Sequence, residues 1–255
     1  MTAFELAGKR ALVVGAEGQA GRAIGLALAE AGADVALVAA TADPAAAFAL
    51  RRLGGQVEAL GRRSLTQATD VTSSQGAQVM VRQVAKELGG LDVLVNAAGL
   101  YLGKPFEKVS DAEWARVLGL NLNATFFTCR AAVREMLRGE GGRIVNVVSL
   151  LALRGLSHSA AYCAAQAAVV NLSRALALEY AGRGIRVNCI VHGWLEGMPG
   201  AGEAAAENPL VRFIPMRRLG RAAELGPLAV YLASDAADYL TGQTYAVDGG
   251  VLQHL

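Results

Sequence analysis

The sequence predicts an α/β fold in which a mainly parallel sheet is covered by helices on both faces. Short apolar runs, typical of buried strands, alternate along the chain with longer segments of helical spacing. A strand that helices cover on both faces is apolar along its whole length, and the runs here have that character. The chain has 255 residues, enough for a large core, and no linker divides it.

The expected elements follow one another regularly. The strands are expected at residues 10–14, 34–40, 67–71, 91–99, 142–149, 185–193 and 244–250. The helices are expected at residues 21–32, 75–88, 111–137, 160–181 and 222–233. Gly32 is placed to end the first helix. This order predicts a single doubly wound Rossmann domain over residues 1–255, with its ligand crevice at the carboxyl ends of the strands.

Composition and charge narrow the possible partners. The chain is 53% hydrophobic and 18% charged with a net charge of +2, and it has no long basic block, so neither nucleic acid nor a membrane is an expected partner. The amino-terminal segment carries Glu5 and only a short apolar run, unlike a signal peptide. Three cysteines without CxxC spacing favour reduced thiols in a cytoplasmic protein, and no metal site is expected.

One segment interrupts the alternation of strands and helices. Residues 194–221 are rich in glycine, proline and charged residues. An insertion of this kind beside the crevice is typical of a mobile lid or a substrate loop. A plain surface excursion is the alternative interpretation.

Five sequence motifs follow one another along the chain in a fixed order and at characteristic spacings. "NAAG" occupies residues 96–99, and "EWARVLGLNLNATFF" carries Asn121. Ser149 closes "IVNVVS", thirteen residues before Tyr162, and "IRVNCIVHG" and "LTGQTYAVDGG" follow. With these motifs at these spacings, nearly the whole chain resembles the short-chain dehydrogenase/reductase family. The resemblance implies hydride transfer between a nicotinamide and a hydroxyl or carbonyl carbon, and subunits that associate through helices 111–137 and 160–181.

The resemblance also implies roles for the residues of the reaction site. Tyr162 would pass the proton, Ser149 would orient the substrate oxygen, and Asn121 would hold a water relay. The family has a lysine one turn after the tyrosine, and Gln166 stands there. A free phenol titrates near ~10, and an ammonium beside it would favour the phenolate. Without that cation, we expect Tyr162 to remain a protonated donor, and His192 is a further candidate base.

The cofactor contacts that the resemblance implies are partly altered. In the phosphate turn "VVGAEGQAG", Gly15 and Gly21 fit the family pattern, while Gly18 lies one residue early. Gln19 stands at the middle glycine position, where a long side chain would crowd the pyrophosphate. Glu17 adds a negative charge to a loop that receives an anion.

The contacts beyond the phosphate turn are also mixed. Ala39 and Ala40 follow the second strand, where the family has an acidic or a basic residue that selects the cofactor. Gly197 replaces a threonine that contacts the carboxamide. Asp70 and Val71 on the adenine side, together with Asn96 and Gly99 of "NAAG", match the family. The expected result is no binding, or weak binding, of NAD(H), with NADP(H) binding still less favoured.

Three functions remain open at this point. The preferred hypothesis is a non-catalytic subunit that supports an active relative in a mixed oligomer. The alternative is an active NAD(P)-dependent reductase with an atypical site made of Ser149, Tyr162 and Gln166. A second alternative is a lyase, isomerase or cyclase that needs no cofactor and uses His192 and Tyr162 as an acid–base pair.

Overall fold

The computed structural model describes residues 4–198 and 210–253, and the strands and helices alternate within them. The strands are β1 (Arg10–Val14), β2 (Asp34–Ala39), β3 (Ser64–Ala68), β4 (Val93–Asn96), β5 (Gly142–Ser149), β6 (Ile185–His192) and β7 (Thr244–Val247). The helices are α1 (Gln19–Glu30), α2 (Pro44–Ala59), α3 (Ser74–Leu88), α4 (Asp111–Leu118), α5 (Ala124–Met136), α6 (Ala160–Tyr180) and α7 (Gly226–Ala233).

The strands form one seven-stranded sheet in the order β3-β2-β1-β4-β5-β6-β7. Every pairing of neighbouring strands is parallel. The order reverses between β1 and β4, which creates the crevice of a doubly wound sheet at the carboxyl ends of these strands. The predicted fold class is therefore confirmed.

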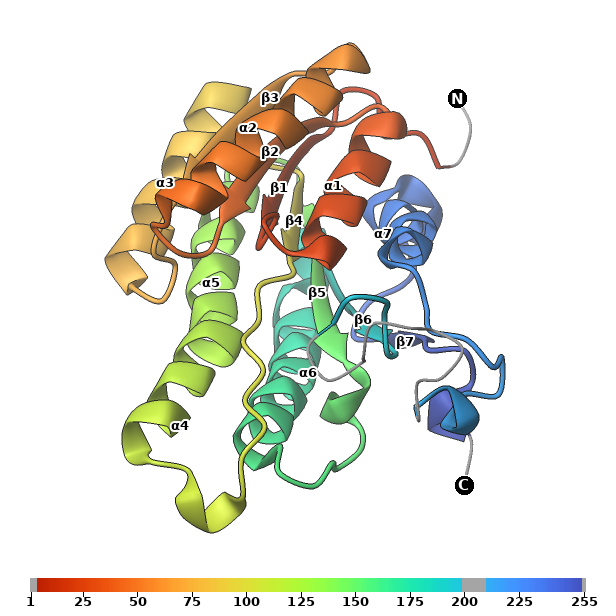
Figure 1. Cartoon of the computed structure of the whole chain (residues 1–255). Coiled ribbons are helices and arrows are strands. Elements are labelled where there is room, and N and C mark those ends of the chain that lie inside the picture. Colours follow the sequence, from red (N-terminus) through yellow and green to blue (C-terminus); the bar gives the residue numbers. More distant parts are fainter. Residues whose placement is uncertain (1–3, 199–209, 254–255) are drawn as a thin grey trace.

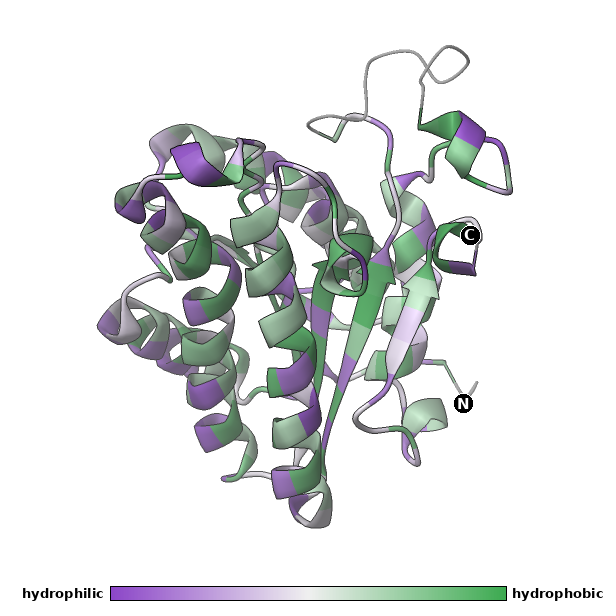
Figure 2. Cartoon of the chain, turned by 90° about the horizontal axis from the view of Figure 1, so that it is seen from below, coloured by the Kyte–Doolittle hydropathy of each residue, from purple (hydrophilic) through white to green (hydrophobic). Residues whose placement is uncertain are grey.

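Helices cover both faces of the sheet (Figure 1). On one face, Val13 of β1 belongs to a core cluster with residues of α1, α2 and α7. On the other face, Leu12 and Val14 of the same strand join a cluster with residues of α3 and α5. Because successive side chains of a strand point to opposite faces, an apolar run such as 10–14 is the sequence of a strand with two covered faces. Figure 2 shows these apolar strands between the helices.

Helix α2 was not predicted from the sequence, and β3 begins three residues before its predicted start at residue 67. The amino-terminal signals of α2 are present, since Asp43 accepts a hydrogen bond from Ala45 N at 3.0 Å and Pro44 stands in the first turn. The pair Gly54–Gly55 resembles a break, but a Cβ on Gly54 would lie 2.8 Å from the Thr66 side chain. The glycine therefore allows α2 to approach β3 closely, which a local pattern does not reveal.

The helix expected at residues 111–137 is divided into two. A π-helical turn, Gly119–Asn123, separates α4 from α5 and carries Asn121. Turns of this kind often lie at functional sites. The expected subunit interface on α4, α5 and α6 stays a prediction, and exposed Trp114, Phe126 and Leu178 lie on these helices.

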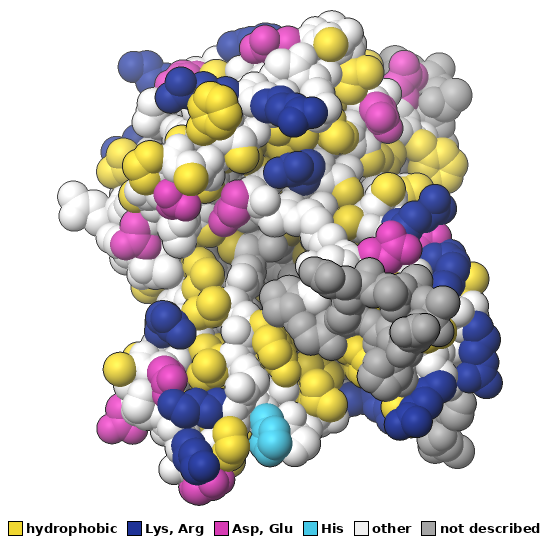
Figure 3. Space-filling view, in the orientation of Figure 1, with side chains coloured by type: hydrophobic (Ala, Val, Ile, Leu, Met, Phe, Trp, Pro, Cys, Tyr) yellow, Lys and Arg dark blue, Asp and Glu magenta, His cyan; other side chains and the backbone are white. Residues whose placement is uncertain are grey.

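On the face seen in Figure 3, charged side chains of both signs are dispersed, and a hollow lies near the middle of the view. Cys129, Cys163 and Cys189 are free thiols. Among the described residues, no helix combines the length and the apolar character that crossing a membrane requires. Most of the predicted lid, residues 199–209, lies outside the described residues, so the lid stays a prediction.

Candidate active site

A cavity of about 350 Å³ opens at the carboxyl ends of the strands. Its walls come from the turn after β1, the loop after β4, the start of α6 and the end of β6. They include Gly18, Gln19, Ala97, Ala98, Gly99, Tyr101, Tyr162, Gln166, His192, Gly197 and Met198. Residues that the sequence analysis assigns to the reaction and to the cofactor therefore meet in one cavity.

Tyr162 lines this cavity, and Ser149 is tied to its wall through the hydrogen bond from Ser149 N to Gln166 Oε1. Ser149 is the last residue of β5, Tyr162 lies in the first turn of α6, and each is 7% exposed. The Tyr101 ring meets the Tyr162 ring edge-on, with 5.3 Å between their centroids. Burial raises the pKa of Tyr162 to about 12, although a hydrogen bond with the Ser149 side chain acts in the opposite direction. The phenol is therefore protonated at neutral pH, as the sequence analysis expects.

Gln166 joins the catalytic strand end to the π-helical turn. Its Oε1 accepts a hydrogen bond from Ser149 N at 2.7 Å, and its Nε2 donates to Asn121 Oδ1 at 3.0 Å. A lysine has donors only and could not accept from Ser149 N. Gln166 therefore does not simply lack a charge, because its carboxamide makes two bonds that hold the site together.

Asn121 is buried, and besides its bond from Gln166 its amide makes hydrogen bonds to the backbone. Its Nδ2 donates to Leu100 O and to Val117 O, both at 2.9 Å. Its Oδ1 also accepts from Leu100 N at 3.3 Å. Asn121 thereby fixes the loop after β4 beside the cavity, and its role in a water relay stays a prediction.

His192 ends β6 next to Ser149, its register partner on β5. Its Nδ1 lies 2.8 Å from Gly193 O, which assigns the proton to Nδ1 and leaves Nε2 as an acceptor. Burial lowers the pKa of His192, so the ring is neutral at neutral pH. The imidazole lines the same cavity as Tyr162, and its catalytic role stays a prediction.

The glycine turn after β1 has the geometry of a phosphate-binding turn. Gly15 has φ +86°, and a Cβ there would lie 2.3 Å from Ala98 N. A Cβ on Gly21 would lie 2.3 Å from Gly15 O, so both glycines are required for close packing. Gly18 caps α1, whose first N–H groups point out of the helix end toward any bound anion.

The two glycines of this turn should differ in their tolerance of a side chain. Gly15→Ala combines a left-handed φ with an impossible contact, so we expect it to lower the free energy of unfolding by more than ~2 kcal/mol. Gly18→Ala is the matched control. At Gly18 a Cβ would lie 3.4 Å from its nearest neighbour, and the loss should stay below ~1 kcal/mol. Urea denaturation measures both values, and equal losses would contradict the assignment.

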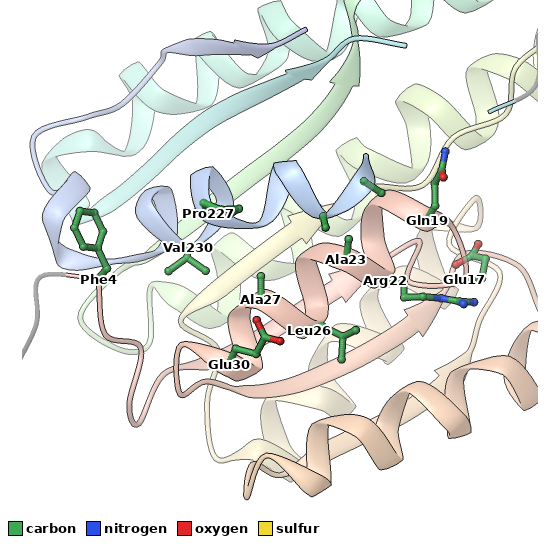
Figure 4. Close-up of a pocket in the computed structure, with 12 residues that line it drawn as sticks. Phe4, Glu17, Gln19, Arg22, Ala23, Leu26, Ala27, Glu30, Pro227 and Val230 are labelled. Carbon is green, nitrogen blue, oxygen red and sulfur yellow. The ribbon is translucent and has the colours of Figure 1, made fainter. Parts of the chain in front are cut away.

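The Gln19 side chain extends from the start of α1 toward the segment after β6. Its Oε1 lies 3.7 Å from the position that a Cβ would take on Gly197. Figure 4 shows the amide projecting away from Glu17 and Arg22 at the same end of the helix. The amide therefore lies beside Gly197 in the wall of the cavity.

The remaining predicted cofactor residues occupy different places. Val71 is buried and its N donates to Ala40 O at 3.2 Å, while Asp70 Oδ1 accepts from Thr72 N, so this loop lies beside the end of β2. Gly99 is part of the cavity wall. The Asn96 side chain points into the core instead and donates to Asn146 Oδ1 at 2.9 Å. Asn96 thus stabilises the strand end from inside.

The position of Glu17 was not predicted from the sequence. Its charge was expected to oppose an anion in the phosphate turn, but Glu17 Oε1 accepts a hydrogen bond from Ala40 N at 3.1 Å. The carboxylate therefore lies at the end of β2, where the expected selector residue is replaced by alanine. The sequence offered one signal for this contact: an acidic residue in the turn after the first strand, together with alanines at the end of the second strand.

Comparisons with known proteins identify relatives that share this fold and length. The sequence profile described as Enoyl-(Acyl carrier protein) reductase matches residues 15–252. D-threitol dehydrogenase of Mycolicibacterium smegmatis is 39% identical over 251 residues, which cover 97% of this chain and 94% of the relative. A structure from Sinorhizobium meliloti, assigned as a short-chain alcohol dehydrogenase, matches with a TM-score of 0.91 at 38% identity, over 99% of this chain and 100% of the other.

A third relative carries a nucleotide. This structure, from Beutenbergia cavernae, is assigned as an NAD(P)-dependent gluconate 5-dehydrogenase and has NADP bound at low occupancy. It matches with a TM-score of 0.87 at 35% identity, over 98% of this chain and 99% of the other.

These findings correct two expectations. The hypothesis of a non-catalytic subunit is wrong, because near full-length relatives are named as dehydrogenases. The expectation of absent or weak nicotinamide binding is also wrong, because a close structural neighbour binds NADP. The physical reason lies at Gln166, whose amide hydrogen-bonds to Ser149 N and to Asn121 Oδ1 and so keeps the site assembled without the lysine. Over nearly its whole length, the chain therefore belongs to the short-chain dehydrogenase/reductase family of oxidoreductases.

Proposed function

We propose that the chain is an NAD(P)-dependent dehydrogenase/reductase of a small polyhydroxylated compound, acting at an atypical Ser149–Tyr162–Gln166 site. The observation that carries this proposal is the buried Tyr162 phenol, which lies close to Ser149 and lines the cavity at the sheet's carboxyl edge. The substrate class is supported by the relatives, which are named for threitol and gluconate. A cavity of about 350 Å³ suits a small substrate beside the reactive end of a nucleotide.

The residues around the crevice fit a nicotinamide dinucleotide. The amino end of α1 and the close approach of Gly15 to the loop after β4 suit a pyrophosphate. Glu17 Oε2 is buried and has no hydrogen-bond partner among the described residues. When bound, the nicotinamide supplies or accepts the hydride. The residues Gly18, Gly99, Gln166 and His192 would line its path toward Tyr162.

The chain's own part in reduction is to handle the proton. Tyr162 donates its phenolic proton to the carbonyl oxygen of the substrate while the carbonyl carbon receives the hydride. The Ser149 hydroxyl holds the same oxygen in place. The product is an alcohol, and Tyr162 then regains its proton from water. Gln166 adds no charge, so the phenol stays an acid throughout the neutral range.

The protonation state of Tyr162 predicts how the rate depends on pH. Because the pKa of Tyr162 is raised to about 12, reduction should have a nearly constant kcat between about pH 6 and pH 9. Alcohol oxidation needs the deprotonated oxygen, so its kcat should rise roughly tenfold per pH unit over that range. Initial rates at saturating substrate measure both profiles. An oxidation rate that levels off near pH 7 would contradict this assignment of the proton.

A substrate screen tests the proposed function. The purified chain is mixed with NADH or NADPH and a panel of short aldoses, ketoses and oxo-sugar acids, and the loss of reduced-nicotinamide absorbance is followed. We expect turnover with at least one compound of this class, and with a deuterated cofactor the deuterium should appear on the carbinol carbon of the product. Turnover of simple aliphatic ketones alone would overturn the substrate class. Absence of turnover with every class would overturn the function.

A further inference from the structure

Glu17 lies between the phosphate turn and the second strand. Its Oε1 accepts from Ala40 N at 3.1 Å, across 23 residues of sequence. Ala39 and Ala40 are fully buried and have no polar side chain. Of Glu17, Ala39 and Ala40, only Glu17 therefore offers a polar side chain to a ligand at the end of β2.

The second carboxylate oxygen of Glu17 is left without a bond. Glu17 Oε2 is buried and has no hydrogen-bond partner within residues 4–198 and 210–253. A buried carboxylate oxygen without a donor costs free energy. Consistent with this, burial raises the pKa of Glu17, although its own N–H and that of Ala40 act in the opposite direction. Glu17 also lines a surface groove, so a rotation of its carboxylate would bring this oxygen to a ligand that supplies a donor.

The position of Glu17 indicates the chemistry of that donor. In a doubly wound domain the adenosine ribose of a dinucleotide lies outside the end of the second strand, next to the glycine turn. Glu17 belongs to that turn and is bonded to that strand end. A ribose diol offers hydroxyl donors, whereas a 2′-phosphate would bring negative charge against the carboxylate.

We infer that Glu17 is a specificity-determining residue: its Oε2 accepts a hydrogen bond from the adenosine ribose diol, and it selects NAD(H) over NADP(H). This inference rests on the proposed function. It supplies the acidic group that Ala39 and Ala40 do not, and it does so from the phosphate turn. A structural neighbour has NADP bound, so the test must compare both nucleotides on this chain.

The side chain of Arg22 suggests the competing outcome, a preference for NADP(H). Arg22 lies in the first turns of α1 and is exposed, and Figure 4 shows it beside Glu17 at one end of the groove between α1 and α7. Among the described residues no ion pair joins Arg22 to Glu17, so the guanidinium is not held on the carboxylate. Arginine can hold a 2′-phosphate. If Arg22 dominates, the chain would favour NADP(H).

Calorimetric titration of the full chain with NAD⁺ and NADP⁺ tests the inference without turnover. We expect wild type to bind NAD⁺ at least about tenfold more tightly than NADP⁺. Glu17→Gln keeps an oxygen for Ala40 N but removes the charge, and it should reduce this ratio by about 10- to 100-fold. Arg22→Ala should leave the ratio within about threefold of the wild-type value. Tighter binding of NADP⁺ by wild type, or an unchanged ratio in Glu17→Gln, would overturn the inference.

A matched variant controls for net charge. Glu30→Gln removes the same charge at the far end of the same helix and groove (Figure 4) and should leave the ratio unchanged. Thermal melting controls for folding. Because the pKa of Glu17 is raised, its ionisation opposes folding, so Glu17→Gln should melt at or above the wild-type temperature near pH 7. Its advantage should shrink as the pH falls through that raised pKa and the wild-type carboxyl becomes neutral.

The outcomes separate this inference from the proposed function. Binding of both nucleotides with NADP⁺ preferred would overturn the role of Glu17 and leave the dehydrogenase intact. Binding of neither nucleotide at millimolar concentration would overturn both. A ratio lost in Glu17→Gln and retained in Glu30→Gln would support the assignment to this one carboxylate.

Discussion

Tyr162→Phe should lower the kcat of carbonyl reduction by roughly 10²- to 10⁴-fold, the range that a positioned general acid contributes. The substitution removes only the hydroxyl. The ring should keep its place in the core and its edge-on contact with Tyr101, so the fold should persist. Steady-state rates at saturating substrate and cofactor measure the effect. Nucleotide affinity, measured by calorimetry, should change by less than about threefold, because the phenol acts on the substrate oxygen.

Tyr101→Phe is the matched control for this experiment. Tyr101 lines the same cavity, but its hydroxyl lies 3.0 Å from Ser159 Oγ, to which it is hydrogen-bonded. Loss of that bond should lower kcat by less than about tenfold. If Tyr162→Phe retained a tenth or more of the wild-type kcat, another group would be the acid, and His192 would be the first to test. Equal losses in both variants would indicate a general disturbance of the cavity.

The sequence could predict the elements whose signals are local. The strands β5 and β6 are long apolar runs between glycines and polar residues, and their bounds agree with the expectation to within one residue. The spacing of Ser149 and Tyr162 could be recognised in the sequence because Ser149 ends a strand and Tyr162 lies in the first turn of the next long helix. A helix broken by glycines, such as α2, was missed because the reason for Gly54 is a neighbouring strand.

The sequence could not predict contacts between distant segments. Gln166 resembles a loss when it is compared with a lysine, and only the fold shows its amide between Ser149 N and Asn121 Oδ1. Glu17 likewise adds a negative charge to the phosphate turn, and only the fold shows its bond to Ala40 N. Both residues were interpreted by the charge they lacked or added. Their hydrogen bonds join segments that are distant in the sequence, so the local pattern does not reveal them.

Gln166→Lys restores the family cation and should change both the pH profile and the stability of the chain. Residues 162 and 166 lie one turn apart on α6, so an ammonium at 166 would be near the phenol. A cation at such a distance lowers a phenol pKa by about 1 to 3 units. The rising limb of the oxidation rate should therefore move to lower pH by about 1 to 3 units. Oxidation near pH 8 should accelerate accordingly, measured as kcat against pH.

The same substitution removes an acceptor that the site uses. Ser149 N would lose its bond to Gln166 Oε1, and an unpaired buried N–H costs about 1–3 kcal/mol in the free energy of unfolding. Gln166→Met is the matched control, because it has similar length and loses the same bonds without gaining a charge. Urea denaturation should show a comparable loss in the free energy of unfolding for both variants. Gln166→Lys should lose more if its ammonium remains buried.

The pair of variants separates charge from hydrogen bonding. A shifted pH profile in the lysine variant alone would mean that the missing cation keeps Tyr162 an acid, and that the chain is built for reduction. A shift in both variants would mean that the Ser149 N–H bond, and not charge, sets the proton affinity of the site. No shift in either would contradict the assignment of the proton to Tyr162. In that case the group that titrates in the oxidation profile must be sought elsewhere in the cavity, where neutral His192 offers an unprotonated Nε2.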